Sequence, residues 1–396
     1  MFESCRAHHK HAITICIMIP EHVKKLGYYQ HNGNDYPNKW QALANCPEDE
    51  HVHWNFNDET YSKHDWSKEP VHDLYEIYKM RAIQLREKYD NVILYFSGGI
   101  DSVCVIRSFL DNNVKIDAVI MYGTWNFKNA EDYAFNLEQF KIGMPLLAEY
   151  QKIQDFEIIL LDTYQFYDNY IDESWIYSTG QLCTPLVYIN GFFHQDPKIQ
   201  KYLMSGSTCF VRGMEKPRVV YDQHVEKWQA GFLDTSFLGS PSGELAIKNK
   251  WDIIEYFFWS PDLPELAIKQ ARIVYNYISK LINAKELFKK HDNKFFSTTE
   301  YQQIVDPLIY GKYTTQQIGK EKNYYSLPKA FDTPNKAYKD GWFWDKELST
   351  KLWVKVWNEG IRLIDKTINK SHYNDPTKSI ELTSLVGSWS KMHNLE

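Results

Sequence analysis

The 396-residue chain has few cysteines, and they lack the spacing of a structural framework. The six cysteines are scattered, with no Cys-x-x-Cys pair, which excludes a disulfide-stapled secreted domain and indicates a reducing compartment. Long apolar runs are also missing, since the run at residues 12–19 stops at Pro20 and is too short to span a bilayer. We therefore expect a cytoplasmic protein, of a cell or of a virus-infected host, with no membrane partner.

An excess of positive charge is absent as well. The net charge of -6 argues against broad nonspecific binding to nucleic acid, so nucleic acid is a possible but disfavoured partner. Aromatic residues, in contrast, are abundant at 16%, and hydrophobic residues make up 43% of the chain. A chain of this length and composition can bury the core of one large domain or of two ordinary ones.

The pattern of apolar residues divides the chain into three parts. Residues 1–70 show little periodicity and predict an irregular N-terminal segment. In residues 71–222, short apolar runs alternate with helical patterns, which is typical of an α/β fold with a parallel sheet and helices on both faces. Beyond residue 223 this alternation is lost, and a long amphipathic pattern after Pro264 predicts a mainly helical C-terminal region, 223–396.

Within the middle part, four apolar runs are candidate strands of the parallel sheet. The candidate strands are residues 92–96, 116–121, 156–161 and 201–204. Helical spacing of apolar residues predicts a helix before the first strand, over residues 73–89, and another after it, ending near residue 110.

The turn between the first strand and the second of these helices reads SGGIDS, residues 97–102. A helix that starts directly after a strand presents backbone N–H groups with no intrahelical acceptor, and this makes an anion site. Glycines let the backbone approach phosphate oxygens closely, and the hydroxyls of Ser97 and Ser102 add donors. Asp101 would repel phosphate unless a divalent cation lies between them or the carboxylate caps the helix.

The spacing excludes two familiar phosphate loops, because the chain has neither G-x-x-x-x-G-K-[ST] nor G-x-G-x-x-G after a strand. The segment resembles the S-G-G-x-D-S loop of the PP-loop (N-type) ATP pyrophosphatases, which include the synthetase domains of asparagine, GMP and NAD synthetases. The resemblance covers about residues 73–222. It implies the HUP, or adenine nucleotide alpha hydrolase-like, fold, with ATP and Mg²⁺ as cofactors and AMP and pyrophosphate as products.

The resemblance also implies a set of site residues. The nucleotide-binding residues would be Tyr95, Phe96, Ser97, Gly98, Gly99, Ile100, Asp101, Ser102, Met121 and Tyr122. In this set the loop residues hold the pyrophosphate, the residues at the strand ends flank adenosine, and Asp101 is a metal ligand.

The loop after the fourth candidate strand contains three cations and would meet the substrate outside the carboxyl ends of the strands. We predict that Lys216 and Arg218 act with Asp101 as catalytic residues by neutralising charge that develops during attack on the α-phosphorus. A solvated charged loop is the plain alternative.

We expect an AMP-forming synthetase or ligase that adenylylates an unidentified small-molecule acceptor, such as a carboxylate, a nucleobase carbonyl or an amide. Residue 2 is Phe, so a glutaminase domain with a catalytic cysteine at that position is not expected. Two alternatives remain open: a module that binds an adenine nucleotide without turning it over, and a PP-loop enzyme that modifies a nucleotide or a nucleic acid base. Salt-sensitive binding to DNA or RNA would favour the latter.

Overall fold

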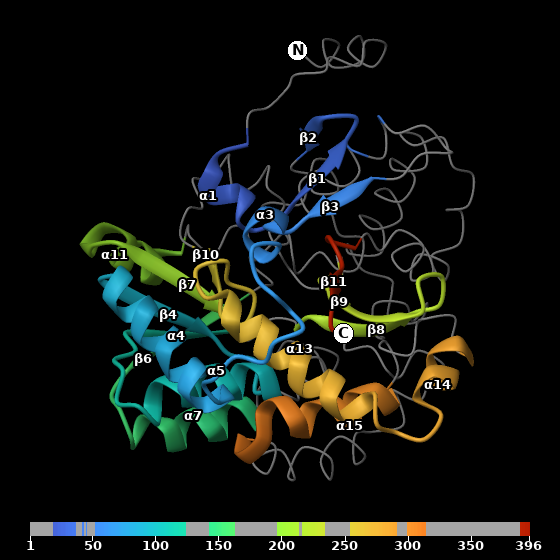
Figure 1. The fold of residues 1–396 in the computed structure, drawn as a ribbon. Helices are drawn as coiled ribbons and strands as arrows, with labels where there is room; N and C mark the ends of the chain where they lie inside the picture. The colour runs from blue at the N-terminus through green and yellow to red at the C-terminus, as the bar shows by residue number, and fades with distance from the viewer. Residues whose placement is uncertain are drawn as a thin grey trace, which may run out of the picture.

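A computed structural model gives the fold of the chain (Figure 1). It describes residues 19–36, 42, 45, 52–123, 142–162, 196–213, 216–233, 254–290, 299–313 and 389–396. Much of the predicted N-terminal segment and most of the C-terminal region after residue 313 lie outside these ranges.

A five-stranded parallel sheet forms the centre of the described structure, in the order β10-β7-β4-β5-β6. Its strands are β4 (Asn91–Tyr95), β5 (Ala118–Gly123), β6 (Glu157–Asp162), β7 (Thr208–Arg212) and β10 (Ile254–Tyr256). The inner strands are buried along most of their length, as expected for a parallel sheet covered by helices. The prediction of an α/β fold with a parallel sheet is therefore confirmed, and helices on both faces remain a prediction.

Two helices flank the first strand of this sheet in sequence. The helix α4 (Leu74–Lys88) begins at a capping box, in which Asp73 accepts from the backbone N–H of Glu76 and Glu76 accepts from that of Asp73. The helix α5 (Ile100–Leu110) follows β4 and packs against α4. The helix α7 (Met144–Gln151) precedes β6.

The fourth strand was predicted at the wrong place. Residues 201–204 lie in the helix α11 (Pro197–Ser205), because Asp196 caps its first turn and Pro197 takes a position at which no N–H bond is needed. The strand is β7, which occupies a part of the predicted loop. Its run of Thr, Cys, Phe and Val is β-branched and aromatic, which suits a buried strand better than the segment before it.

The parallel sheet continues beyond residue 222, where the α/β part was predicted to end. β10 belongs to the later region and pairs in parallel with β7, with Glu255 opposite Val211. The described helices of that region are α13 (Pro264–Ile278), α14 (Ala284–Lys290) and α15 (Thr299–Tyr310). α13 packs on α4, and α15 packs on α13 and α5, so these later helices lie against the two helices that flank β4 in sequence (Figure 1).

Two antiparallel sheets complete the described structure. One is ordered β2-β1-β3, and the other β11-β9-β8. Their strands are β1 (Tyr28–His31), β2 (Asn34–Tyr36), β3 (His53–Asn55), β8 (Arg218–Asp222), β9 (Lys227–Gly231) and β11 (His393–Asn394). Two single-turn helices, α1 (Glu21–Lys24) and α3 (Asp58–Tyr61), accompany the first sheet. β11 thus pairs with β9, with His393 buried and Asn394 exposed.

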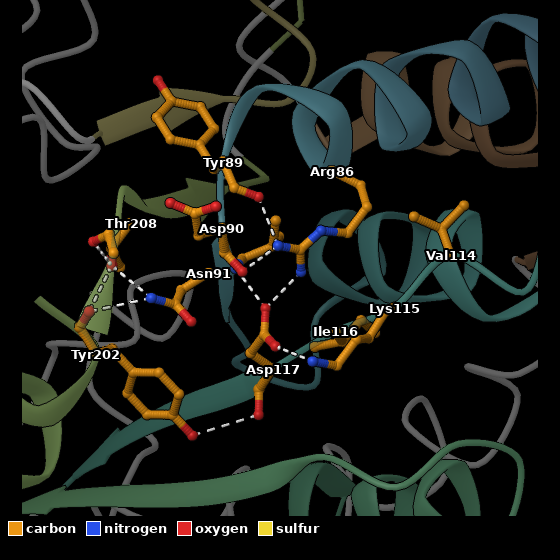
Figure 2. A network of polar contacts seen from close by, with 12 residues as sticks. Arg86, Tyr89, Asp90, Asn91, Val114, Lys115, Ile116, Asp117, Tyr202 and Thr208 are labelled. Carbon is orange, nitrogen blue, oxygen red and sulfur yellow. Dashed lines mark hydrogen bonds and ion pairs between the residues drawn. The ribbon is translucent and has the colours of Figure 1, made fainter.

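A polar network joins the amino ends of the parallel strands, and Figure 2 shows it from close by. Arg86 donates to a carboxylate oxygen of Asp117 at 2.5 Å and also to the carbonyl oxygens of Tyr89 and Asp90. Asp117 accepts in turn from the backbone N–H of Val92 at 2.8 Å. This network fixes the end of the sheet that lies opposite the glycine loop.

None of the helices that the structure describes is both long enough and apolar enough to cross a membrane.

Candidate functional site

The SGGIDS loop lies where the order in which strands are added to the parallel sheet reverses. From β4 the chain passes through α5 to β5 on one side, whereas from β7 it continues to β10 on the other side. β4 and β7 are neighbours, with Leu94 opposite Val211. The segments that leave these two strands therefore diverge, and in open α/β sheets ligands bind outside the strand ends at such a point.

The glycines of the loop have structural reasons for their positions. Gly98 has a φ of 81°, a conformation that side chains disfavour. A Cβ atom on Gly98 would also lie 3.1 Å from the backbone of Gly143, just before α7. Gly99 is the N-cap of α5 and offers no side-chain acceptor to the first turn. The free N–H groups of that turn are thus left to another acceptor.

The two serines of the loop hold it in shape. Ser97 Oγ accepts from the backbone N–H of Gly99 at 3.2 Å, and Ser102 Oγ donates to the carbonyl of Gly99 at 2.9 Å. Ser102 also accepts from the backbone N–H of Ser97 at 3.3 Å and is buried. The predicted donation of the Ser102 hydroxyl to phosphate would therefore compete with its bond to the carbonyl of Gly99, whereas Ser97 is only the acceptor in its bond with Gly99.

Asp101 and Lys216 meet at the start of α5. Lys216 Nζ lies 3.3 Å from Asp101 Oδ1, and the lysine side chain is only 12% exposed. Gly213, just after β7, lets the chain pass close to α5, because a Cβ atom there would lie 2.6 Å from Val105 Cγ2 and 3.1 Å from the carbonyl oxygen of Asp101. The structure thus brings together two of the three predicted catalytic residues.

Two residues of α15 complete the cluster. Tyr310 donates its hydroxyl to Asp101 Oδ1, and Asp306 Oδ1 lies 3.7 Å from Lys216 Nζ. Burial raises the pKa of Asp306. The positive charges of Lys216 and Arg218 oppose this rise, and the negative charge of Asp101 adds to it. Burial, followed by the charges of Asp101 and Asp306, raises the pKa of Tyr310 well above its usual value. Its phenol therefore remains a donor at neutral pH.

Arg218, the third predicted catalytic residue, opens β8 and is near enough for its charge to act on Asp306. The side chains predicted to flank adenosine differ in their accessibility. Tyr95 is half-buried with the Arg212 guanidinium 4.7 Å from its ring centroid, whereas Phe96 and Met121 are buried in the core. The side chains of Phe96 and Met121 are therefore closed to a ligand.

Two further residues predicted to bind the nucleotide lie at the start of α5 and on β5. Ile100 is the first residue of α5, and its backbone N–H is one of those that a helix start leaves unsatisfied. The backbone of Tyr122 belongs to β5, and its side chain lies outside the described part of the structure.

The residues present fit a magnesium ion that arrives with phosphates. Mg²⁺ in such sites keeps several waters and takes one or two carboxylates together with the phosphates of the substrate. Asp101 and Asp306 are two carboxylates that share Lys216, and each side chain is about one-third exposed. The described ranges contain no group of three or more metal-ligating side chains, so an all-protein metal cage is not formed there.

Asp306 and Tyr310 were not identified from the sequence. Tyr310 is 209 positions from its partner Asp101, and neither α15 residue belongs to a motif. The chain matches no family model, and a search of curated proteins finds no significant match.

Proposed function

We propose that this chain binds ATP with Mg²⁺ at residues 97–102 and transfers its adenylyl group to a small-molecule acceptor, releasing pyrophosphate. The observation that carries the proposal is the position of the SGGIDS loop. The loop joins a buried parallel strand to the start of a helix, at the point where the strand order of the sheet reverses. Lys216, which follows the neighbouring strand, lies beside the aspartate of this loop.

In this proposal the loop backbone holds the phosphates distal to the reaction. The N–H groups of the first turn of α5 face an anion, and the helix dipole favours negative charge at the same place. Lys216 and Arg218 neutralise the charge that develops on the departing pyrophosphate. When bound, Mg²⁺ would offset the repulsion between the phosphates and Asp101, which with Asp306 is positioned to ligate it.

The chemistry needs placement and charge neutralisation more than proton transfer. A carboxylate acceptor is already anionic and could attack without a general base. Other acceptors would need a base, and the described cluster contains one acid with a raised pKa, Asp306, whose side chain is about one-third exposed. The acceptor is therefore proposed only as an oxygen nucleophile of a small molecule.

The test is product analysis with ATP labelled at the α-phosphate, Mg²⁺ and a metabolite extract that contains acceptors. We expect labelled AMP and a new labelled or altered mass, and we expect Asp101→Asn to abolish release of pyrophosphate. Asp65→Asn is the matched control, because Asp65 also pairs with a lysine, Lys68 at 3.0 Å, but on the surface. Labelled ADP as the sole product would refute the proposal. ATP binding without pyrophosphate release would instead support a nucleotide-binding module.

A further inference from the structure

The helix α15 brings two side chains to the candidate site from outside the α/β segment that the sequence indicated. Asp306 and Tyr310 are four residues apart on this helix, so they lie one above the other on the same face. That face is directed at Asp101 and Lys216, and α15 packs on α5, which carries Asp101.

The contacts of the Asp101 carboxylate fall on one of its two oxygens, Oδ1. Tyr310 and Lys216 both bind Oδ1, and Lys216 Nζ additionally lies 4.8 Å from the centroid of the Tyr310 ring. Among the described residues, Oδ2 receives neither a hydrogen bond nor an ion pair. One carboxylate oxygen is thus engaged by the protein, and the other is left for a ligand.

The tyrosine that makes this contact is itself firmly held. Tyr310 is fully buried, and its ring packs against Phe258 with the centroids 6.1 Å apart. The preceding residue is tied to α4, because Tyr78 donates its hydroxyl to the carbonyl of Ile309 at 2.9 Å. A buried, protonated and anchored phenol can therefore fix the orientation of the carboxylate that accepts from it.

We infer, on the basis of the proposed function, that α15 positions the Asp101–Lys216 pair for a cation-bound nucleotide. Tyr310 ties Oδ1 of Asp101 to α15, so that Oδ2 is the oxygen presented to the cation. Asp306 shares the charge of Lys216, so that the lysine does not fully neutralise Asp101. Groups that hydrogen-bond a metal-ligating side chain in this way fix its orientation and tune its affinity.

The first test removes only the hydroxyl of Tyr310. We would measure the binding of ATP to the full chain as a function of Mg²⁺ concentration, for the wild type and for Tyr310→Phe. The variant should need roughly 10- to 100-fold more Mg²⁺ for half-maximal binding, the usual loss when a partner of a metal ligand is removed. Its weak binding of ATP without Mg²⁺ should be unchanged, since the loop backbone is intact.

Tyr301→Phe is the matched control. Tyr301 lies on the same helix, is buried, and its hydroxyl accepts from the backbone N–H of Val219 at 3.2 Å, with no contact to Asp101. The Tyr301→Phe variant loses one buried hydroxyl, as Tyr310→Phe does, so any general loosening of α15 should affect both variants. We expect Tyr301→Phe to keep the wild-type Mg²⁺ requirement.

The outcomes separate the inference from the proposed function. If the wild type shows no Mg²⁺-dependent binding of ATP, both are wrong. If it does, and Tyr310→Phe has the same Mg²⁺ requirement, the role of α15 is wrong and the proposed function stands.

A second variant tests α15 if Tyr310→Phe does not fold. Asp306→Asn removes a carboxylate positioned to ligate Mg²⁺ together with its ion pair to Lys216, so the Mg²⁺ requirement should rise by at least the roughly 2- to 5-fold that a part-exposed ion pair contributes. An unchanged requirement in this variant would likewise contradict the inference.

Discussion

Replacing Glu255 by glutamine should destabilise the fold strongly, because this carboxylate sits at the centre of a buried charge network. Glu255 is 3% exposed and accepts from Arg81, Lys25 and Lys88 at 2.9, 2.9 and 3.0 Å, and from the Tyr89 hydroxyl at 2.6 Å. Arg81, at 0% exposure, would keep its charge in the interior without a carboxylate. Removing one partner of a buried ion pair typically costs about 3–5 kcal/mol.

The loss should be measurable by urea titration. Glutamine retains the shape and one acceptor, so we expect the lower end, about 3 kcal/mol, which is a large part of a typical total stability of roughly 5–15 kcal/mol. The control is Glu59→Gln, which breaks an exposed pair with Lys63 at 2.8 Å and should leave the stability close to that of the wild type. If both variants unfold at the same urea concentration, the network does not hold β10 to α4.

Three further predictions follow from single residues. Gly98→Ala should lose about 1–3 kcal/mol and weaken ATP binding, because of its left-handed φ and its approach to Gly143; wild-type affinity in titrations would contradict this. His393 is stacked on Trp66, and burial lowers its pKa from 6.5 to about 4. As the pH falls, the unfolded state therefore binds a proton at this histidine before the folded state does. The free energy of unfolding should fall by about 3 kcal/mol between pH 6.5 and pH 4. His393→Phe should flatten that part of the pH profile in thermal unfolding, and an unchanged slope would refute this origin. Lys216→Met should slow pyrophosphate release by about 100-fold or more, and a wild-type rate would exclude its catalytic role.

The sequence predicted the elements whose pattern is local and strong. β4, α5 and the loop between them could be identified because an apolar run, two glycines and a helical period follow one another within 20 residues. The strand after α11 was misplaced because a short apolar stretch, residues 201–204, reads equally well as a strand or as a helix face. There the cap at Asp196 decides the outcome, and the periodicity does not.

Only the part of the candidate site formed by the SGGIDS loop and the segment after the neighbouring strand could be predicted from the sequence. Lys216 was identified because it follows a strand next to the loop, although that strand was assigned to the wrong residues. Asp306 and Tyr310 carry no motif, and their relation to Asp101 arises from the packing of α15 on α5. Such a contact, between residues about 200 positions apart, depends on tertiary packing that periodicity does not encode.

The central claim is that the backbone at residues 97–102 grips the phosphates of ATP, and hydrogen exchange of that segment tests it most directly. With Mg²⁺ and ATP, amides in the peptide that spans the loop and the first turn of α5 should exchange more slowly, whereas AMP should have little effect. Peptides around Asp117, at the opposite end of the strands, should be unaffected by either nucleotide. If ATP leaves the loop amides unprotected, or protects only a distant segment, the nucleotide site is not where we place it.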